Sequence, residues 1–227
     1  MSIERVPRTS ETTVAPVVPL PLPAVSRPDN VYTRSVKPGF DVCAAAIVLV
    51  VAALPMIVIA GVVALTMGRP VLFRQQRIGL DGEPFEILKF RTMRPSAPGV
   101  LVNEWTKEND PRVTRFGRFL RSTHLDELPQ VVNIVRGDLA VVGPRPEQPH
   151  YVKELSAKLA FYDLRHLVRP GLTGWAQVKY GYAGDEGDAL EKLQYEFFYL
   201  RRQGFAFDFR VILRTIRSMA GGLGKGR

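Results

Sequence analysis

An uninterrupted apolar run from Val42 to Met67 constrains this chain more than any other feature. At about 1.5 Å of rise per residue, a helix of this length can cross the roughly 30 Å hydrocarbon core of a bilayer. The run begins far from the N-terminus and has no convincing cleavage site, which argues against a secretory signal. The sequence therefore predicts a segment that enters a membrane.

The flanks of this run and its central proline indicate the path of the segment. Basic residues lie on both sides, with Arg34 and Lys37 before the run and Arg69, Arg74 and Arg77 after it. Because Lys and Arg favour the cytoplasmic side, both ends are drawn to the same compartment. Pro55 removes a backbone donor near the middle and favours a bend there. We expect a re-entrant helix-break-helix, with an ordinary kinked transmembrane helix as the alternative.

Composition and layout predict one further domain. Residues 1–36 are rich in Pro and lack periodicity, which is typical of a disordered cytoplasmic tail, and residues 37–68 form the membrane segment. Residues 69–227 are long enough for a single packed domain. The single Cys43 excludes an internal disulfide framework. A formal charge of +9 indicates a phosphate-rich partner, which leaves nucleic acid, anionic lipid and a nucleotide open.

Local patterns predict an α/β fold that is mostly helical. The expected elements are strands over 71–77, 84–90 and 139–142 and helices after Thr114 and over 151–167, 190–202 and 205–219. The helix after Thr114 carries Arg115, Arg118 and Arg121 as a basic stripe, for which a solvated helix face is the plain alternative. The last helix mixes apolar and basic residues, so it fits either an interfacial helix or a core helix with a charged outer face.

Two segments carry candidate chemistry. Asp126 and Glu127 lie where Thr123 and the following apolar residues predict a capped helix of about three turns that stops at Gly137. A helix N-terminus would hold Asp126 ionised, as a nucleophile or metal ligand must be, although the pair fits simple capping equally well. Two prolines around Arg145 make a rigid loop, which suits a phosphate clamp. The histidines lack metal-ligand spacing.

In this order, the motifs resemble the bacterial sugar transferase family, the monotopic phosphoglycosyl transferases. The matching tracts are Lys89-Phe-Arg91-Thr-Met93, Asn109-Asp-Pro-Arg112, Gly117-Arg118-Phe-Leu-Arg121, Leu125-Asp126-Glu127-Leu-Pro-Gln130, Gly143-Pro-Arg145-Pro146 and Arg169-Pro-Gly171-Leu-Thr-Gly174-Trp175-Ala-Gln177. Each tract alone is weak, but six in family order are specific. One departure is Leu54, because members often have Ser before the membrane-break proline, which here is Pro55.

The resemblance implies that a sugar-1-phosphate moves from a UDP-sugar to polyprenyl (undecaprenyl) phosphate with release of UMP, which starts exopolysaccharide, capsule or O-antigen assembly. In the family, the residue matching Asp126 forms a covalent phosphosugar intermediate and contacts Mg2+. Glu127 matches a residue thought to act as base, and Arg121 matches a phosphate ligand. Lys89, Arg91, Arg118 and Arg145 fall at further basic positions that we expect to bind phosphate.

The resemblance also implies a small cytoplasmic catalytic domain with interfacial helices, on the inner leaflet of the bacterial inner membrane. Larger members carry additional transmembrane helices, so we expect a minimal member here. The sequence leaves open whether the protein forms a homodimer. The competing hypotheses are a membrane-anchored protein that binds anionic lipid or nucleic acid, and a scaffold of a polysaccharide export complex. We expect no nucleic acid as partner, because the basic stripe lacks interleaved aromatic residues for base stacking.

Overall fold

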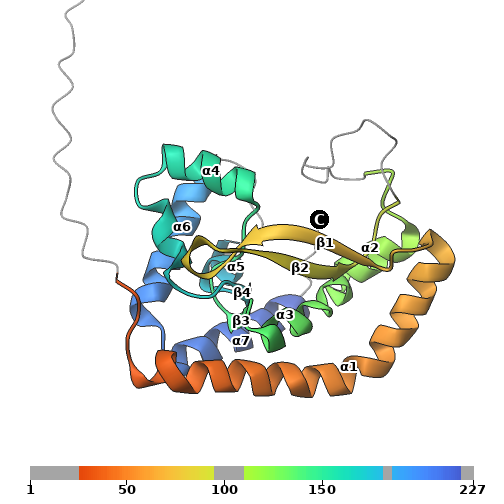
Figure 1. The fold of residues 1–227 in the computed structure, drawn as a ribbon, viewed down its shortest axis with the longest axis horizontal. Coiled ribbons are helices and arrows are strands. Elements are labelled where there is room, and N and C mark those ends of the chain that lie inside the picture. The colour runs from red at the N-terminus through yellow and green to blue at the C-terminus, as the bar shows by residue number, and fades with distance from the viewer. Residues whose placement is uncertain (1–25, 95–109, 181–185, 221–227) are drawn as a thin grey trace, which may run out of the picture.

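The computed structural model describes residues 26–94, 110–180 and 186–220, and their fold is mostly helical with two small sheets (Figure 1). The helices are α1 Lys37–Met67, α2 Arg115–Ser122, α3 Gln130–Arg136, α4 Pro149–Lys158, α5 Trp175–Tyr180, α6 Glu186–Arg202 and α7 Phe205–Ala220. The strands are β1 Leu72–Ile78, β2 Pro84–Phe90, β3 Ala140–Val142 and β4 Gly171–Thr173. Most of the predicted N-terminal tail lies outside the described residues.

The apolar run forms α1, which follows a π-helical turn, η1 (Tyr32–Val36). Together they are the one helical stretch in the described part of the chain that is long and apolar enough to cross a membrane. The helix continues through Pro55, but Figure 1 shows it running along one side of the molecule and then bending sharply. A proline inside a helix is the usual cause of such a bend. The expected break is therefore a bend in a continuous helix.

One side of α1 packs against the rest of the fold on both sides of Pro55. Ala45 and Leu49 join a core cluster with β2 and α3, and Ile59 and Val63 join a second cluster with β2 and α2. The other side is apolar and exposed, and includes Ile47, Val50, Val51, Leu54, Ile57 and Leu65. An exposed apolar surface of this extent marks an interaction site.

The hairpin of β1 and β2 forms as predicted, with antiparallel pairing that sets Phe73 opposite Lys89. The free edge of β2 is covered by α3 through Asn133. Its side-chain oxygen accepts from the Leu88 N–H at 3.0 Å, and its amide donates to the Glu86 carbonyl at 2.7 Å. Asn133 is fully buried, so both bonds are shielded from water. This fixes α3, and the residues just before it, relative to β2.

The second sheet pairs β3 and β4 in parallel. The loops that follow these strands touch backbone to backbone, because a Cβ on Gly171 would lie 2.0 Å from the Gly143 nitrogen and one on Gly174 would lie 2.2 Å from the Gly143 carbonyl oxygen. Only glycine permits this approach. The predicted Arg145 loop and the segment around Gly171 and Gly174 are thus one packed unit.

The helix predicted over 151–167 is wrong in its second half. α4 ends at Lys158, Phe161 takes a left-handed conformation with φ of 64°, and a 3-10 turn, η4 (Tyr162–Leu167), follows. This break turns Arg165 into the core, where it pairs with Glu196 of α6. The tertiary ion pair outweighs the local helical pattern.

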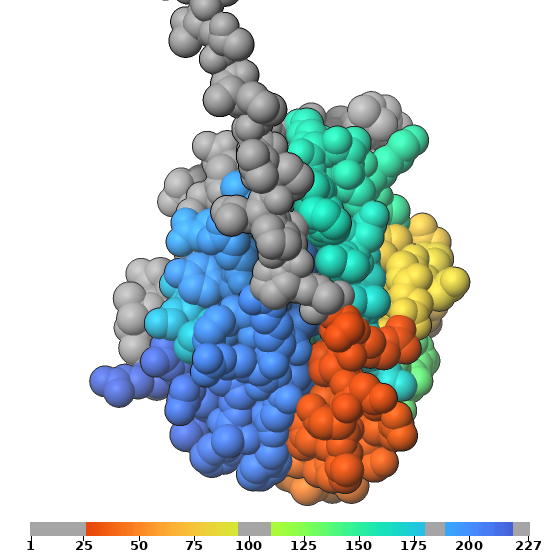
Figure 2. Space-filling model, turned by 90° about the vertical axis from the view of Figure 1, so that its left-hand side faces the viewer, coloured from red at the N-terminus to blue at the C-terminus, as the bar shows by residue number. Residues whose placement is uncertain are grey.

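α6 and α7 form where the sequence predicts them. α7 buries Asp208 and Val211 against the core and exposes an apolar stripe made of Phe205, Phe209, Leu213 and Ile216. A core helix would bury this stripe, so the geometry favours the interfacial alternative. The start of α1 lies beside α7, since the rings of Phe40 and Phe205 meet edge to face at 6.3 Å. Figure 2 shows these segments side by side at one end of the molecule.

Candidate active site

The two adjacent carboxylates lie on a short 3-10 turn, η3 (Leu125–Glu127), between α2 and α3. The predicted capping box does not form, because the Thr123 hydroxyl donates to the Phe119 and Leu120 carbonyls at the end of α2. The expected three-turn helix is therefore η3 followed by α3, which ends at Gly137 as predicted.

The residues that flank the carboxylates pack against the long apolar helix α1. Leu125 and Leu128 contact the cluster that contains Ile59 and Val63 of α1. Partial burial of these leucines holds the turn, and each contributes less than the roughly 1.5–3 kcal/mol of a fully buried leucine. The carboxylates are thereby held beside the second half of α1.

Glu127 is held by two cations from different elements. The Nζ of Lys89, at the end of β2, lies 2.5 Å from Glu127 Oε1, and the Nη2 of Arg145 lies 3.9 Å from the same oxygen. Burial raises the pKa of Glu127, but Lys89 and Arg145 together outweigh it and bring the pKa to about 2. In this state Glu127 is a weak proton acceptor and a strong anchor for both cations. The sequence predicted all three residues for this site.

Asp126 differs from its neighbour in pKa and in partners. Burial raises its pKa to about 6, with Lys89 and Arg121 opposing the shift and Glu127 adding to it. No α-helix begins at Asp126, so the expected helix N-terminus does not hold it ionised, and desolvation opposes its ionisation. With a pKa of about 6, the carboxyl is nevertheless mostly ionised at pH 7. Its carboxylate forms no hydrogen bond or ion pair with any residue in the described ranges, which leaves its oxygens open to a cation.

The carboxylate oxygens of Asp126 suit a magnesium ion shared with the substrate better than a metal ion held only by protein side chains. The described ranges contain no group of three or more His, Cys, Asp or Glu side chains able to hold a metal. Mg2+ commonly binds one or two carboxylates together with substrate phosphates and water. A partly buried carboxylate without a hydrogen-bond or ion-pair partner in the described ranges, as Asp126 is, suits that arrangement.

The other predicted basic residues do not all face the carboxylates. Arg121 does: its Nε donates to the Thr92 hydroxyl at 2.9 Å, and its charge acts on Asp126. Arg91 instead donates to the Met67 carbonyl at 3.1 Å, at the end of α1. Arg118 is exposed and has no ion pair with a residue that the structure describes. Arg91 and Arg118 are thus not part of this cluster.

This difference predicts unequal effects of two alanine substitutions. Arg121→Ala should lower kcat/KM by about tenfold or more, because it removes a partly buried cation beside Asp126. Arg118→Ala should change kcat/KM by less than about threefold, since an exposed charge is screened by water and salt. Steady-state kinetics of both purified variants measure this. Equal small losses would make the basic stripe a solvated helix face.

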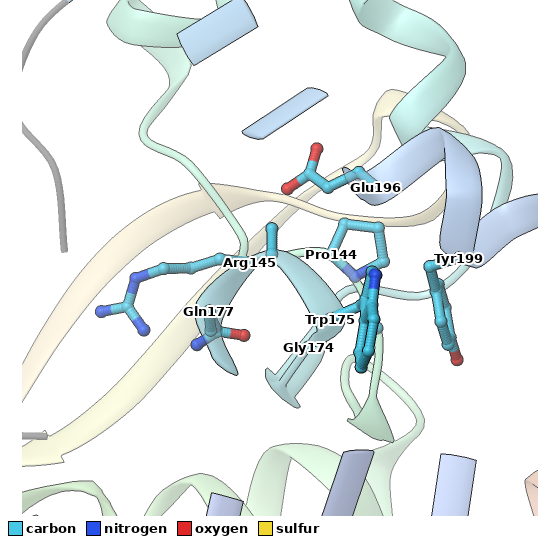
Figure 3. A pocket seen from close by; sticks show the side chains of 9 residues that line it. Pro144, Arg145, Gly174, Trp175, Gln177, Glu196 and Tyr199 are labelled. Carbon is cyan, nitrogen blue, oxygen red and sulfur yellow. The ribbon is translucent and has the colours of Figure 1, made fainter. Parts of the chain in front are cut away.

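Arg145 lines a pocket together with residues of its own loop and of helices α5 and α6. Figure 3 shows its guanidinium extending away from Glu196 and Trp175, on the side where the Gln177 amide lies. Glu196 instead pairs with Arg165, whose Nη2 donates to the Arg145 carbonyl at 2.7 Å. The sequence analysis missed Thr92, Asn133, Arg165 and Glu196. Of these, only Thr92 had a signal in the sequence, because it lies inside one of the matching tracts. The contacts of the other three residues come from long-range packing.

The amino-acid sequence is similar to those of known proteins. Residues 32–222 match the family model described as bacterial sugar transferase. Similar proteins are the UDP-glucose:undecaprenyl-phosphate glucose-1-phosphate transferases of Escherichia coli, 38% identical over 92% of this chain and 44% of the relative, and Caulobacter vibrioides, 38% identical over 94% and 77%. The UDP-N-acetylgalactosamine-undecaprenyl-phosphate N-acetylgalactosaminephosphotransferase of Aeromonas hydrophila is 36% identical over 87% of this chain and 46% of the relative.

The chain spans less than half the length of the Aeromonas and Escherichia proteins. The family match nevertheless covers the membrane helix, both sheets and the described helices that surround the carboxylates. On this match, the chain belongs to the bacterial sugar transferase family.

Proposed function

We propose that this protein transfers a sugar-1-phosphate from a UDP-sugar to undecaprenyl phosphate and releases UMP. The observation that carries the proposal is a pair of carboxylates, surrounded by Lys89, Arg121 and Arg145, held directly beside an exposed apolar helix. Phosphoryl transfer needs positioned charge more than proton chemistry, and a lipid acceptor needs a site at the membrane. The similar transferases act on a UDP-sugar and on undecaprenyl phosphate by name, which fits both requirements.

The reaction would proceed in two displacements at one phosphorus atom. A carboxylate oxygen of Asp126 attacks the phosphorus that bears the sugar, the bond from that phosphorus to the bridging oxygen breaks, and UMP leaves with the electron pair. An oxygen of undecaprenyl phosphate then attacks the same phosphorus and frees Asp126. Lys89, Arg121 and Arg145 neutralise the phosphate charges. Glu127 holds Lys89 and Arg145 in place, and gains basicity when these cations turn toward phosphate.

Mg2+ would be held by Asp126 together with the diphosphate of the donor, and its chemistry there is to neutralise negative charge. Lys89 is already engaged with Glu127, and Arg121 with Thr92. Without the metal, these protein cations would have to balance the negative charges of two carboxylates and a diphosphate.

The competing hypotheses, a lipid-binding or nucleic-acid-binding protein and an export scaffold, are not favoured. A surface that only binds anions gains nothing from Asp126, a partly buried carboxylate that repels them. The names of the relatives point to transferases.

The proposal is tested by incubating detergent-solubilised protein with undecaprenyl phosphate, Mg2+ and a panel of UDP-sugars, while UMP release is measured. We expect UMP release only when both substrates are present, with one preferred sugar. Release of UMP that does not depend on undecaprenyl phosphate would reject the assignment of the acceptor. Absence of release from every donor would reject the proposed reaction.

We also propose that α1 enters and leaves the bilayer on the same, cytoplasmic side. Both of its ends are tied to one domain. At its start, the Nζ of Lys37 donates to Asp208 of α7 at 2.7 Å, and Asp41 accepts from the Val141 N–H at 3.2 Å. At its end, the Met67 carbonyl accepts from Arg91. A helix that crossed the membrane would have to carry one of these polar contacts through the hydrocarbon core, at a cost of several kcal/mol.

Cysteine labelling tests this topology. Cysteines at the exposed positions of Arg34 and Arg74, with Cys43 replaced by Ser, should both resist a membrane-impermeant thiol reagent in intact cells and react once the cells are opened. The position of Arg77 is less suitable, because that side chain is largely buried. Labelling of position 34 alone in intact cells would show a true span.

A further inference from the structure

The loop that carries Arg145 is held at four consecutive carbonyl groups. The donors are the Gly171 N–H to Pro144 at 2.8 Å, Arg165 Nη2 to Arg145 at 2.7 Å, Arg77 Nη1 to Pro146 at 2.9 Å, and the Ile78 N–H to Glu147 at 3.0 Å. They come from β4, η4 and β1, so parts of the chain distant in sequence converge on one short loop. Two of the four donors are guanidinium groups.

The first guanidinium, of Arg165, is buried together with its counter-ion. Only 4% of the Arg165 side chain and 6% of the Glu196 side chain is exposed, and the two groups meet at 2.8 and 2.7 Å. The remaining Nη1 donates to the Tyr162 hydroxyl at 2.7 Å. Burying an ion pair of this kind costs desolvation energy that an apolar pair would not. Fold stability alone therefore does not explain why an arginine occupies this position.

The second guanidinium, of Arg77, is also largely buried. Its Nη2 donates to the Gln75 side chain at 2.7 Å, and its Nη1 lies 3.7 Å from the Glu147 carboxylate. Burial lowers its pKa to about 10, so the group remains charged at neutral pH. A charged donor forms a stronger hydrogen bond to a carbonyl than a neutral amide does.

A fixed loop backbone matters because of where the Arg145 side chain must reach. Its guanidinium lies 3.9 Å from Glu127, on the side of the loop away from Glu196 (Figure 3). An arginine side chain has many rotamers, and its backbone position decides which of them reach Glu127. A displacement of about 1 Å at a reacting group can cost about a hundredfold in rate.

We propose that Arg165 and Arg77, with their partners Glu196 and Glu147, are positioning residues that hold the 144–147 loop and so direct Arg145 toward Glu127 and the substrate phosphates. The assignment of Arg145 to phosphate rests on the proposed function. Arg165 and Arg77 are not assigned a direct contact with Asp126, Glu127 or the substrate. They act through the loop backbone.

The test replaces the buried pair with apolar residues of similar size, Arg165→Met with Glu196→Leu, so that no unpaired charge is left in the core. The matched control removes an exposed ion pair of α4, Lys158→Gln with Glu154→Gln, and keeps the same net charge. Hydrogen exchange of the Gly171 and Ile78 amides, which donate to the Pro144 and Glu147 carbonyls of the loop, should accelerate by about tenfold or more in the first variant and stay unchanged in the control. Unchanged exchange in the first variant would overturn the proposal.

Activity measurements test the link to Arg145. The apolar pair should lower kcat/KM for the UDP-sugar by about tenfold or more, and should cause no further loss in an Arg145→Ala background, because both changes remove the same interaction. Multiplied losses would overturn the proposal. Faster hydrogen exchange in the first variant, combined with no UMP release from the wild-type protein, would support the role of Arg165 in holding the loop and reject the proposed reaction.

A second variant guards against misfolding of the first. Arg165→Lys keeps a charge opposite Glu196 but cannot hold both Glu196 and the Arg145 carbonyl. It should show the same faster loop exchange and the same dependence on Arg145. Wild-type exchange and activity in this variant would overturn the proposal.

Discussion

Asp126→Asn should abolish turnover, lowering UMP release by about a thousandfold or more, because the amide cannot attack phosphorus. The protein should remain as stable as the wild type, or become more stable, in the absence of metal. Burial raises the pKa of the Asp126 carboxyl to about 6. Ionisation at pH 7 or above therefore costs folding free energy that the neutral amide avoids.

Two measurements on Asp126→Asn separate chemistry from folding. UMP release reports the reaction, and the thermal unfolding midpoint in the presence of a chelator reports stability. The matched control is Asp163→Asn, which changes a carboxylate far in sequence from the site and should keep wild-type activity. Near wild-type UMP release from Asp126→Asn would reject the covalent mechanism. A large loss of stability would show instead that Asp126 is structurally required.

Removal of Mg2+ should stop the reaction almost as completely, with a loss of at least about a hundredfold in excess chelator. Asp126, Glu127 and the donor diphosphate would otherwise concentrate negative charge in one partly buried place. Lys89 and Arg145 also face Glu127, so the protein cations that act on the phosphates do not balance both carboxylates and the diphosphate by themselves.

The chelator experiment needs a restoration step. Added Mg2+ should return full activity, whereas the same ionic strength supplied as NaCl should not. In Asp126→Asn, affinity for Mg2+ in the presence of a UDP-sugar should fall, because one carboxylate ligand is lost. Full activity in excess chelator would exclude the metal from the mechanism.

Local patterns predicted the elements that are held by local interactions. Thr114 caps α2 by accepting from the Gly117 N–H at 2.9 Å, as expected, and Gly137 ends α3 with φ of 84°. The β1–β2 hairpin also follows from its alternating residues and its turn. The roles of the site residues were assigned by resemblance. Of the basic residues among them, the structure places Lys89, Arg121 and Arg145 near Asp126 or Glu127.

Features set by distant contacts were not predictable. The charge state of Asp126 depends on burial beside α1, which the segment around it does not encode. The early end of α4 depends on Arg165 reaching Glu196, a residue of another helix. An arginine in a helical pattern normally indicates a solvated face, so its burial cannot be recognised from the sequence alone.

The contact between Lys37 and Asp208 joins residues 171 positions apart and is almost fully shielded from water. At typical bacterial elongation rates, Lys37 would leave the ribosome on the order of 10 to 30 s before Asp208 does. Until then, the counter-ion of Lys37 is Asp41, one turn along the same helix at 3.5 Å. If α1 enters the bilayer as proposed, the contact with Asp208 forms only after insertion, so it would fasten α1 to the domain rather than guide the helix into the membrane.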